Sequence, residues 1–364
     1  MKRWAIILIL TPILLNGCVQ REILDDLNIE TALGYDLVDE NTIEGTGLFA
    51  RYLSDKTTEN VTISASAGST REIFGKLEQR SQQPLVRGGL EAVLVGESLA
   101  HKGVINIGDS LQRDPSVGSR VYIAVVKGSS KELLNGEYGH RGNAIFISNL
   151  LEHNIRKRDV PETNLHLFLF NHFQEGQTAY LPMIRQLDEK NMEIAGVALF
   201  DKDKVVAEIP SEDMFYFKLL VDKYSEGSHI VKLNKKGKST IGKKIEATIN
   251  SLDSKNNIVI KNNGLPPKME IKVKIKGIIK EYTGEKLSPK IITTIEKKMV
   301  KDIEKHGNKM INMFKEKKID PLGIGQHLKH EVRGFDFKKW EASYPQADIK
   351  VKADVKIVES GTVE

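Results

Sequence analysis

The chain has 364 residues, of which 40% are hydrophobic and 28% are charged, and its formal net charge is +5. This composition is typical of a globular protein with more than one packed core. The single cysteine excludes an internal disulfide and a cysteine-based zinc site, and no apolar run after residue 18 is long enough to span a bilayer.

Residues 1–17 have the layout of an export signal, with a basic start at Lys2 and Arg3 and an apolar run up to Leu15. The run is shorter than the ~20 residues that cross a membrane. Leu15, Gly17 and Cys18 resemble the bacterial lipobox, in which the Cys thiol is diacylated and becomes the first residue of the mature protein. We therefore expect a lipoprotein signal peptide over 1–17 and a diacylglyceryl anchor on Cys18 at the extracytoplasmic face of a membrane. The alternatives are a cysteine that only lies near a cleavage site and an N-terminal anchor that is retained.

Charge is distributed unevenly along the chain. Residues 231–318 carry 23 Lys, no Arg and nine Asp and Glu, a net charge of +14, whereas residues 18–230 carry 22 basic and 32 acidic residues, a net charge of −10. An excess of Lys without Arg argues against nucleic acid as a partner, because Arg supplies the bidentate contacts to phosphate and guanine. The basic half either faces anionic lipid or an acidic partner, or is an ordinary solvated surface.

Strands and helices are predicted to alternate in the first half. Residues 29–38 and 42–51 form a hairpin around a turn at 39–41, and a helix begins near Ser69 with Thr70 as its cap. The remaining predicted elements are strands over 90–95 and 120–126, helices over 98–111, 129–134 and 143–156, a helix capped by Thr163 and ending near Phe173, strands over 193–200 and 205–209, and a helix from Ser211 to about Tyr224.

The Lys-rich half has the clearest pattern. Residues 271–276 and 349–357 alternate apolar and mostly charged side chains, which predicts two strands with one buried face. Between them Ser288 caps, and Pro289 opens, a helix that runs to about 318. His306 is predicted to pack with the apolar stripe of this helix. A row of lysines at i, i+4 spacing is predicted to be exposed: Lys297, Lys301, Lys305 and Lys309.

These elements predict a multi-domain α+β fold with mixed sheets and packed helices. We divide the chain into the signal peptide (1–17), an N-terminal α+β region (18–194) and a C-terminal α+β region (195–364) that contains the Lys-rich segment 231–318.

No organised catalytic motif is found. His327 and His330 have their Glu outside the pair, unlike zincin patterns, and Gly323-Ile324-Gly325 lacks the rest of a phosphate-binding loop. Gly34-Tyr35-Asp36 and Arg113-Asp114-Pro115 are interpreted as turns. We therefore expect no enzyme, no catalytic residues, no metal site and no cofactor.

Several landmarks resemble the Ger(x)C lipoproteins, the C subunits of spore germinant receptors. They are the lipidated Cys18, Arg21-Glu22-Ile23, Ala32-Leu33-Gly34-Tyr35-Asp36, Val93-Leu94-Val95-Gly96-Glu97, Gly196-Val197-Ala198-Leu199-Phe200, and then Asp320, Gly323, Trp340 and a closing strand up to Gly361.

The resemblance implies three α+β domains and a lipid-anchored, non-enzymatic subunit beside A and B membrane subunits, at the outer face of the spore's inner membrane. Such a subunit is needed for nutrient-triggered germination. The alternative is a lipid-anchored solute-binding protein, which would need a cleft between two lobes lined by polar and aromatic groups. A surface hydrolase is a third class, for which the chain has no motif.

Overall fold

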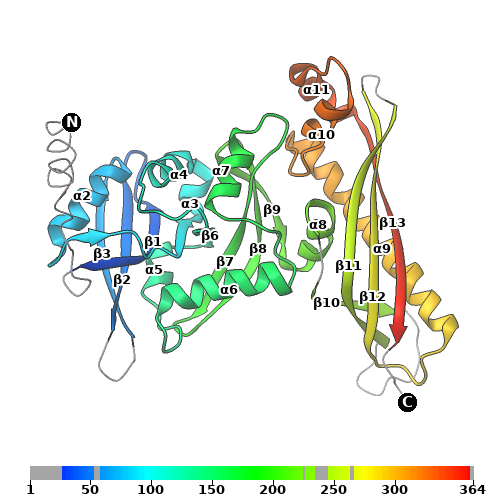
Figure 1. Cartoon of the computed structure of the whole chain (residues 1–364), viewed down its shortest axis with the longest axis horizontal. Coiled ribbons are helices and arrows are strands. Elements are labelled where there is room, and N and C mark those ends of the chain that lie inside the picture. Colours follow the sequence, from blue (N-terminus) through cyan, green and yellow to red (C-terminus); the bar gives the residue numbers. More distant parts are fainter. Residues whose placement is uncertain (1–26, 53–57, 224–225, 234–244, 263–265, 361–364) are drawn as a thin grey trace, which may run out of the picture.

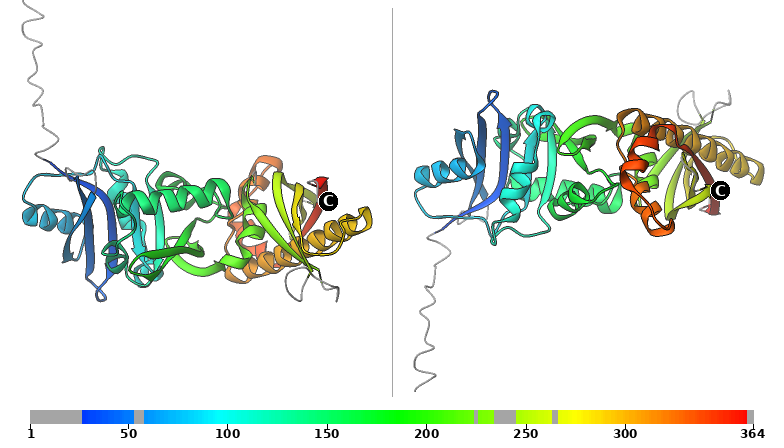
Figure 2. Two further views of the ribbon diagram at one scale, coloured as in Figure 1. Left: turned by 90° about the horizontal axis from the view of Figure 1, so that it is seen from below. Right: turned by 90° about the horizontal axis from the view of Figure 1, so that it is seen from above.

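The computed structural model describes residues 27–52, 58–223, 226–233, 245–262 and 266–360. The predicted signal segment, Cys18, Arg21-Glu22-Ile23 and Gly361 lie outside these residues. The chain forms two sheets that follow one another along the long axis of the molecule (Figures 1 and 2). The multi-domain α+β fold expected from the sequence is confirmed.

The first sheet has nine strands. In the order β3-β2-β1-β5-β6-β7-β8-β9, the four strands β1, β5, β6 and β7 run parallel, the outer strands are antiparallel, and β4 pairs with the start of β1. The strands are β1 (Asn28–Leu37), β2 (Ile43–Tyr52), β3 (Thr58–Ala67), β4 (Leu85–Val86), β5 (Ala92–Gly96), β6 (Tyr122–Lys127), β7 (Tyr180–Asp188), β8 (Asn191–Asp201) and β9 (Lys204–Pro210).

Helices cover both faces of this sheet. Successive residues of its central strands point to opposite faces, and because both sets are apolar, each face packs against helices. In β5, Val93 and Val95 share a core with α2 (Thr70–Arg80), α3 (Glu97–Lys102), α4 (Ile105–Gln112) and α7 (Leu165–Phe173). Ala92 and Leu94 instead share a core with α5 (Ser130–Leu134) and α6 (Asn143–Lys157). Both faces of the central strands are therefore buried.

Four details of the first lobe differ from the sequence prediction. Ser69 caps α2 in place of Thr70, and Asn164 caps α7 in place of Thr163, because these side chains accept the N–H of the third helical residue. The predicted helix over 98–111 is two helices, since Gly103 at φ +143° breaks it. Gly34-Tyr35-Asp36 lies within β1 and is not a turn.

The second sheet has the order β10-β11-β12-β13. Its strands are β10 (Ser228–Leu233), β11 (Ile245–Asn262), β12 (Lys268–Tyr282) and β13 (Asp348–Ser360). Ile271, Val273 and Ile275 are buried while the lysines between them are exposed, as predicted. The helices of this lobe are α8 (Met214–Val221), which follows a 3₁₀ turn η2 (Ser211–Asp213) and ends before the predicted Tyr224, α9 (Pro289–Lys317), α10 (Ile324–Glu331), α11 (Phe337–Ser343) and a 3₁₀ turn η3 (Tyr344–Gln346).

Helix α9 confirms the predicted long helix. The Ser288 hydroxyl accepts the Ile291 N–H as its N-cap, and all four lysines of the predicted row are exposed. The helix also lies along the outer edge of β13. Side chains of Asn308, Glu304 and Glu296 accept backbone N–H groups of Val351 (3.0 Å), Ala353 (3.4 Å) and Ile357 (2.9 Å) respectively.

The two lobes share one hydrophobic core around α8. Phe217 of α8 packs edge-on against Tyr180 of β7, with ring centroids 5.4 Å apart, and against Phe314 of α9 at 6.2 Å. The neighbouring Lys218 is buried and donates to the carbonyl oxygens of residues at the end of α6: Ile155 (2.6 Å), Arg158 (3.0 Å) and Val160 (2.8 Å). Helix α8 therefore joins the lobes through both apolar and polar contacts.

Candidate functional site

A second junction joins the lobes, between the loop that leads into β7 and the segment that follows α9. Gly176 and Gly325 allow the two backbones to touch, because a Cβ on Gly325 would lie 2.9 Å from the Gly176 Cα atom. The Thr178 N–H donates to the Asp320 carbonyl oxygen at 2.9 Å, and the Gln326 side chain donates to the Glu175 carbonyl oxygen. The close backbone approach and these hydrogen bonds make the junction a specific interface between the lobes.

Asp320 is the buried charge at this junction. Its Oδ2 atom accepts the Gly325 N–H at 2.8 Å, next to the start of α10, where the left-handed Gly323 (φ +65°) turns the chain. Burial raises the pKa of Asp320 to about 7, although backbone N–H donors oppose the rise. Burial therefore favours the protonated form of this carboxyl group, relative to an exposed aspartate.

A pocket of about 400 Å³ lies at this junction. Thr178, Asp320 and Tyr344 line it, and the Thr178 Oγ1, Asp320 Oδ1 and Tyr344 hydroxyl oxygens are buried with no hydrogen-bond partner in the described chain. Trp340, whose ring centroid is 4.9 Å from that of Tyr344, also lines the pocket. Burial raises the pKa of the Tyr344 hydroxyl well above its ordinary value, so the group stays protonated.

Two lysines of the pocket lining have unusual backbone conformations. Lys202 and Lys318 have φ of 54° and 55°, and within the described residues they are the non-glycine residues with positive φ. Lys318 is the left-handed C-cap of α9, and Lys202 lies in the turn between β8 and β9, so both conformations occur where the chain reverses beside the pocket. The pocket thus combines buried oxygens that lack partners with two lysines held at chain reversals.

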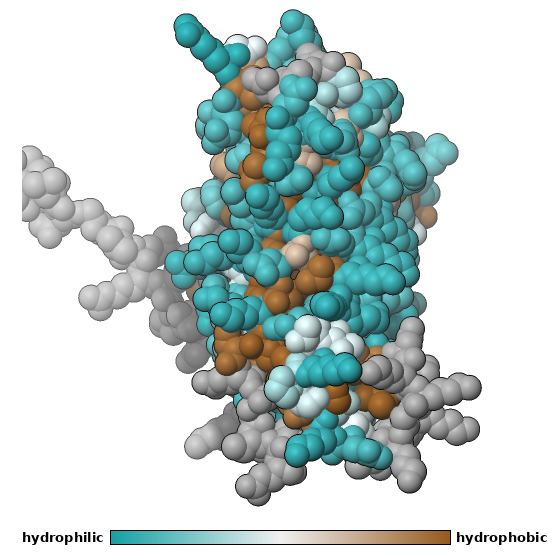
Figure 3. Space-filling model, turned by 90° about the vertical axis from the view of Figure 1, so that its right-hand side faces the viewer, coloured by the Kyte–Doolittle hydropathy of each residue, from teal (hydrophilic) through white to brown (hydrophobic). Residues whose placement is uncertain are grey.

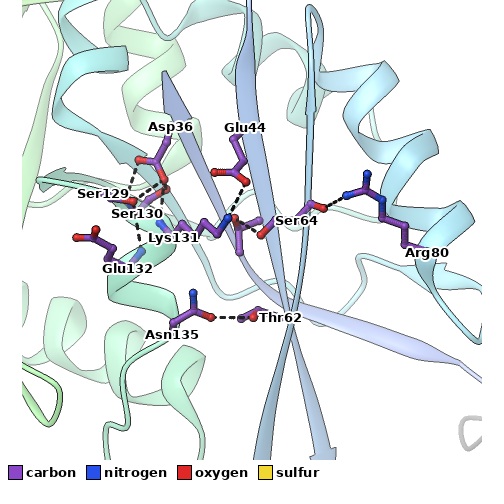
Figure 4. Close-up of polar contacts among 11 residues, drawn as sticks. Asp36, Glu44, Thr62, Ser64, Arg80, Ser129, Ser130, Lys131, Glu132 and Asn135 are labelled. Carbon is purple, nitrogen blue, oxygen red and sulfur yellow. Dashed lines mark hydrogen bonds and ion pairs between the residues drawn. The ribbon is translucent and has the colours of Figure 1, made fainter. Parts of the chain in front are cut away.

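A different polar cluster lies at the end of β1, and its groups satisfy one another (Figure 4). Asp36 accepts from the N–H groups of Ser130 (2.8 Å) and Lys131 (2.9 Å) and from the hydroxyls of Ser129 and Ser130. Lys131 pairs in turn with Glu44 at 2.7 Å. These bonds fix α5 against β1 and β2, and we assign the cluster a structural role.

A buried ion pair lies inside the first lobe. The Arg87 Nε atom lies 2.8 Å from Glu30 Oε2, with both side chains nearly inaccessible, and its Nη1 atom lies 3.5 Å from Asp114. The guanidinium also covers the Phe74 ring at 4.1 Å. Burial raises the pKa of Glu30, and the positive charge of Arg87 opposes that rise.

Glu97, His101 and Glu208 bring metal-ligating atoms within 4.8 Å of one another, and in the described chain they form the one such group of three. Lys127 already pairs with Glu208 at 2.7 Å, and the His101 Nδ1 atom contacts the Val205 carbonyl oxygen at 3.0 Å. The group is explained by these contacts without a cation.

The histidines singled out in the sequence do not converge. His327 and His330 lie on α10 and belong to no three-residue ligand group in the part of the chain that the structure describes. His306 stacks on Tyr216, with ring centroids 4.2 Å apart, as packing predicts. Its Nδ1 atom also lies 2.7 Å from Asp213, a polar contact that the sequence pattern did not reveal.

No local sequence pattern points to this pocket. In the sequence, Asp320, Gly323 and Trp340 stand out only as landmarks of the family resemblance, and Gly323-Ile324-Gly325 lacks the pattern of a phosphate loop. The lining comes from separate segments near residues 175, 202, 320 and 340, which only the fold brings together. The proposed lipidation site, Cys18, lies outside the described residues. None of the helices within those residues is both long and apolar enough to span a membrane.

Comparison with known proteins covers nearly the whole chain. Residues 20–186 match the family described as "Spore germination protein N-terminal domain", and residues 195–361 match "Spore germination B3/ GerAC like, C-terminal". The chain is 33% identical to the spore germination protein GerQC of Bacillus cereus over 100% of both chains. It is 24% identical to the putative spore germination protein YfkR of Bacillus subtilis (strain 168), over 82% of this chain and 79% of that one.

The fold has a solved counterpart. The crystal structure of the GerBC protein superposes with a TM-score of 0.58 at 16% sequence identity, covering 90% of this chain and 96% of that chain. Both family domains match in order, and the similarity to GerQC runs from end to end. The chain is therefore a member of the Ger(x)C (GerAC) family of spore germination proteins.

Proposed function

We propose that this chain is the lipid-anchored, non-catalytic C subunit of a membrane germinant receptor that triggers spore germination in response to nutrients. The observation that carries the proposal is the full-length similarity to GerQC. The lipobox-like Leu15, Gly17 and Cys18 support a diacylglyceryl anchor at the extracytoplasmic face of the membrane. The A and B membrane subunits of the receptor are the proposed partners.

The anchor would act by confinement. Each buried CH₂ of an acyl chain contributes about 0.8 kcal/mol, so two chains hold a domain firmly on a bilayer. Confinement to the membrane plane raises the effective concentration of the chain near membrane partners. The elongated arrangement of the two lobes extends the surface available for such contacts beyond that of one domain (Figure 2).

The surface at the C-terminal end suits a chain that works in water beside a membrane. Seen from that end, hydrophilic residues cover most of the molecule, and a narrow run of hydrophobic residues crosses them (Figure 3). Exposed lysines of β12 and α9 contribute to the basic character of this lobe, including Lys272, Lys274, Lys297 and Lys301.

The test is Cys18→Ala in the spore-forming host, with Asn16→Ala as a matched control in the same segment. We expect Cys18→Ala to leave the membrane fraction and to slow germination, while Asn16→Ala stays lipidated and active. Mass spectrometry of the mature N-terminus identifies the thioether and its acyl chains. Membrane fractionation of Cys18→Ala identical to that of the unaltered chain would contradict the anchor. A germination response unchanged by deletion of the whole gene would contradict the receptor role.

A further inference from the structure

The pocket between the lobes holds an unusual concentration of unsatisfied chemistry. In the described part of the chain, six buried side-chain atoms have no hydrogen-bond partner, and three of them belong to residues that line this one pocket: Thr178, Asp320 and Tyr344. A buried polar atom without a partner is costly and rare in native folds. Three such oxygens around one pocket indicate a ligand that supplies the missing hydrogen bonds.

The three oxygens fit a primary ammonium group. One belongs to a carboxyl group and two belong to hydroxyls, and each can accept a hydrogen bond. An ammonium group offers three N–H donors and no acceptor, so its donors match the three oxygens one to one. Trp340 and Tyr344 add aromatic surface that stabilises a cation.

The remaining charges of the lining favour an anionic group at the other end of the same ligand. Lys202 and Lys318 line the pocket, and their positive charges disfavour a simple cation. Glu175, Asp201 and Glu341 also line it and disfavour a simple anion. A molecule with both charges can place its ammonium group near the carboxylates and its anionic group near the lysines, so neither charge is repelled.

We propose that this pocket binds a small zwitterion, with its ammonium group on Thr178, Asp320 and Tyr344 and its anionic group toward Lys202 and Lys318. The inference goes beyond the proposed receptor role, since it assigns a ligand site to this subunit itself. The three oxygens are closed off from solvent in this structure, so binding requires the pocket walls to part. Both lobes contribute to those walls, and a bound ligand would therefore favour one arrangement of the lobes.

The experiment is isothermal titration calorimetry on the full chain in detergent with glycine, β-alanine and 4-aminobutyrate, which differ in the separation of their charges. Methylamine and acetate serve as single-charge probes. We expect one of the three zwitterions to bind at least tenfold more tightly than either single-charge probe. Binding of none of them, or equal binding of acetate or methylamine, would overturn the proposal.

Tyr344→Phe and Tyr138→Phe form a matched pair. Both hydroxyls are buried without a partner in the described chain, but Tyr138 lies in the α5–α6 core of the first lobe and not at the pocket. Removal of such a hydroxyl should leave the fold intact or more stable. We expect Tyr344→Phe to weaken zwitterion binding about tenfold and Tyr138→Phe to leave it unchanged. Equal affinities of the two variants would refute the assignment. The comparison does not depend on substituting the buried Asp320, a change that could prevent folding.

Discussion

Arg87 provides a sharp test of how the first lobe is stabilised. Arg87→Met removes the guanidinium and leaves the Glu30 carboxylate, which has 0% exposure, without its partner. Breaking a buried ion pair on one side costs about 3–5 kcal/mol, since the remaining charge is desolvated and uncompensated. Loss of the contact with the Phe74 ring adds to this. We therefore expect the free energy of unfolding to fall by about 3–5 kcal/mol.

The loss should depend on pH in a defined direction. Burial already raises the Glu30 pKa above 4.5, and without Arg87 the pKa rises further. Above pH 4.5 the unfolded chain releases this proton while the native variant retains it, so the stability of the variant falls as pH rises through that window. The deficit of Arg87→Met should therefore be smaller at pH 5 than at pH 8.

Urea unfolding followed by circular dichroism, together with hydrogen exchange of the β1 amides, measures these changes. Arg113→Met is the control, because Arg113 makes an exposed ion pair with Asp109, and its loss should leave the free energy of unfolding nearly unchanged. The double variant Glu30→Met/Arg87→Met should recover most of the loss, as apolar replacements of buried ion pairs do. A loss below about 1 kcal/mol for Arg87→Met, or a double variant no better than the single one, would refute this reasoning.

Three further predictions concern the second lobe and its junction. Lys301→Glu should raise stability by about 0.5–1 kcal/mol in urea unfolding, because it replaces repulsion with Lys297 and Lys305 by attraction; an unchanged or lower midpoint would contradict this. Lys218→Met should lower stability by about 3 kcal/mol, since three carbonyl oxygens, that of Val160 fully buried, lose their donor; a loss as small as that of the surface variant Lys131→Met would argue against it. The folded pKa of Asp320, about 7, lies above its unfolded value near 3.8, so stability should fall as pH rises from 4 to 7. Asp320→Asn should remove that slope, and an unaltered pH profile of the unfolding midpoint would contradict the shift.

Local sequence signals predicted the elements that obey simple periodicity. The alternation around Ile271 and Val273 and the Ser288-Pro289 start of α9 have the same form in the structure, because one buried face and one cap determine them. The exposed lysine row follows from the same helical geometry. Cap positions were wrong by one residue at α2 and α7, where two adjacent polar side chains could each serve.

Other features depend on contacts that the sequence does not reveal. Strand β3 is half-buried, and its polar side chains give no clear alternation, so no strand was predicted there. Strand β7 contains Pro182, which argues against a strand interior. The pocket could not be predicted, because Thr178, Lys202, Asp320 and Tyr344 are far apart in the chain and meet only when the two lobes pack.

The contact between α9 and β13 covers one edge of the second sheet. Glu296 and Asn308 are twelve residues apart, about 18 Å along the helix, while the amides that they bind, those of Ile357 and Val351, are six residues apart, about 20 Å along the strand. The two spacings are nearly equal, so side chains of the helix stay opposite amides of the strand from one end of this span to the other. Three outward amides of the strand, those of Val351, Ala353 and Ile357, are occupied by these side chains, which disfavours extension of the sheet by a foreign strand at this border. A partner protein that meets this edge would therefore have to recognise side chains rather than pair with the strand.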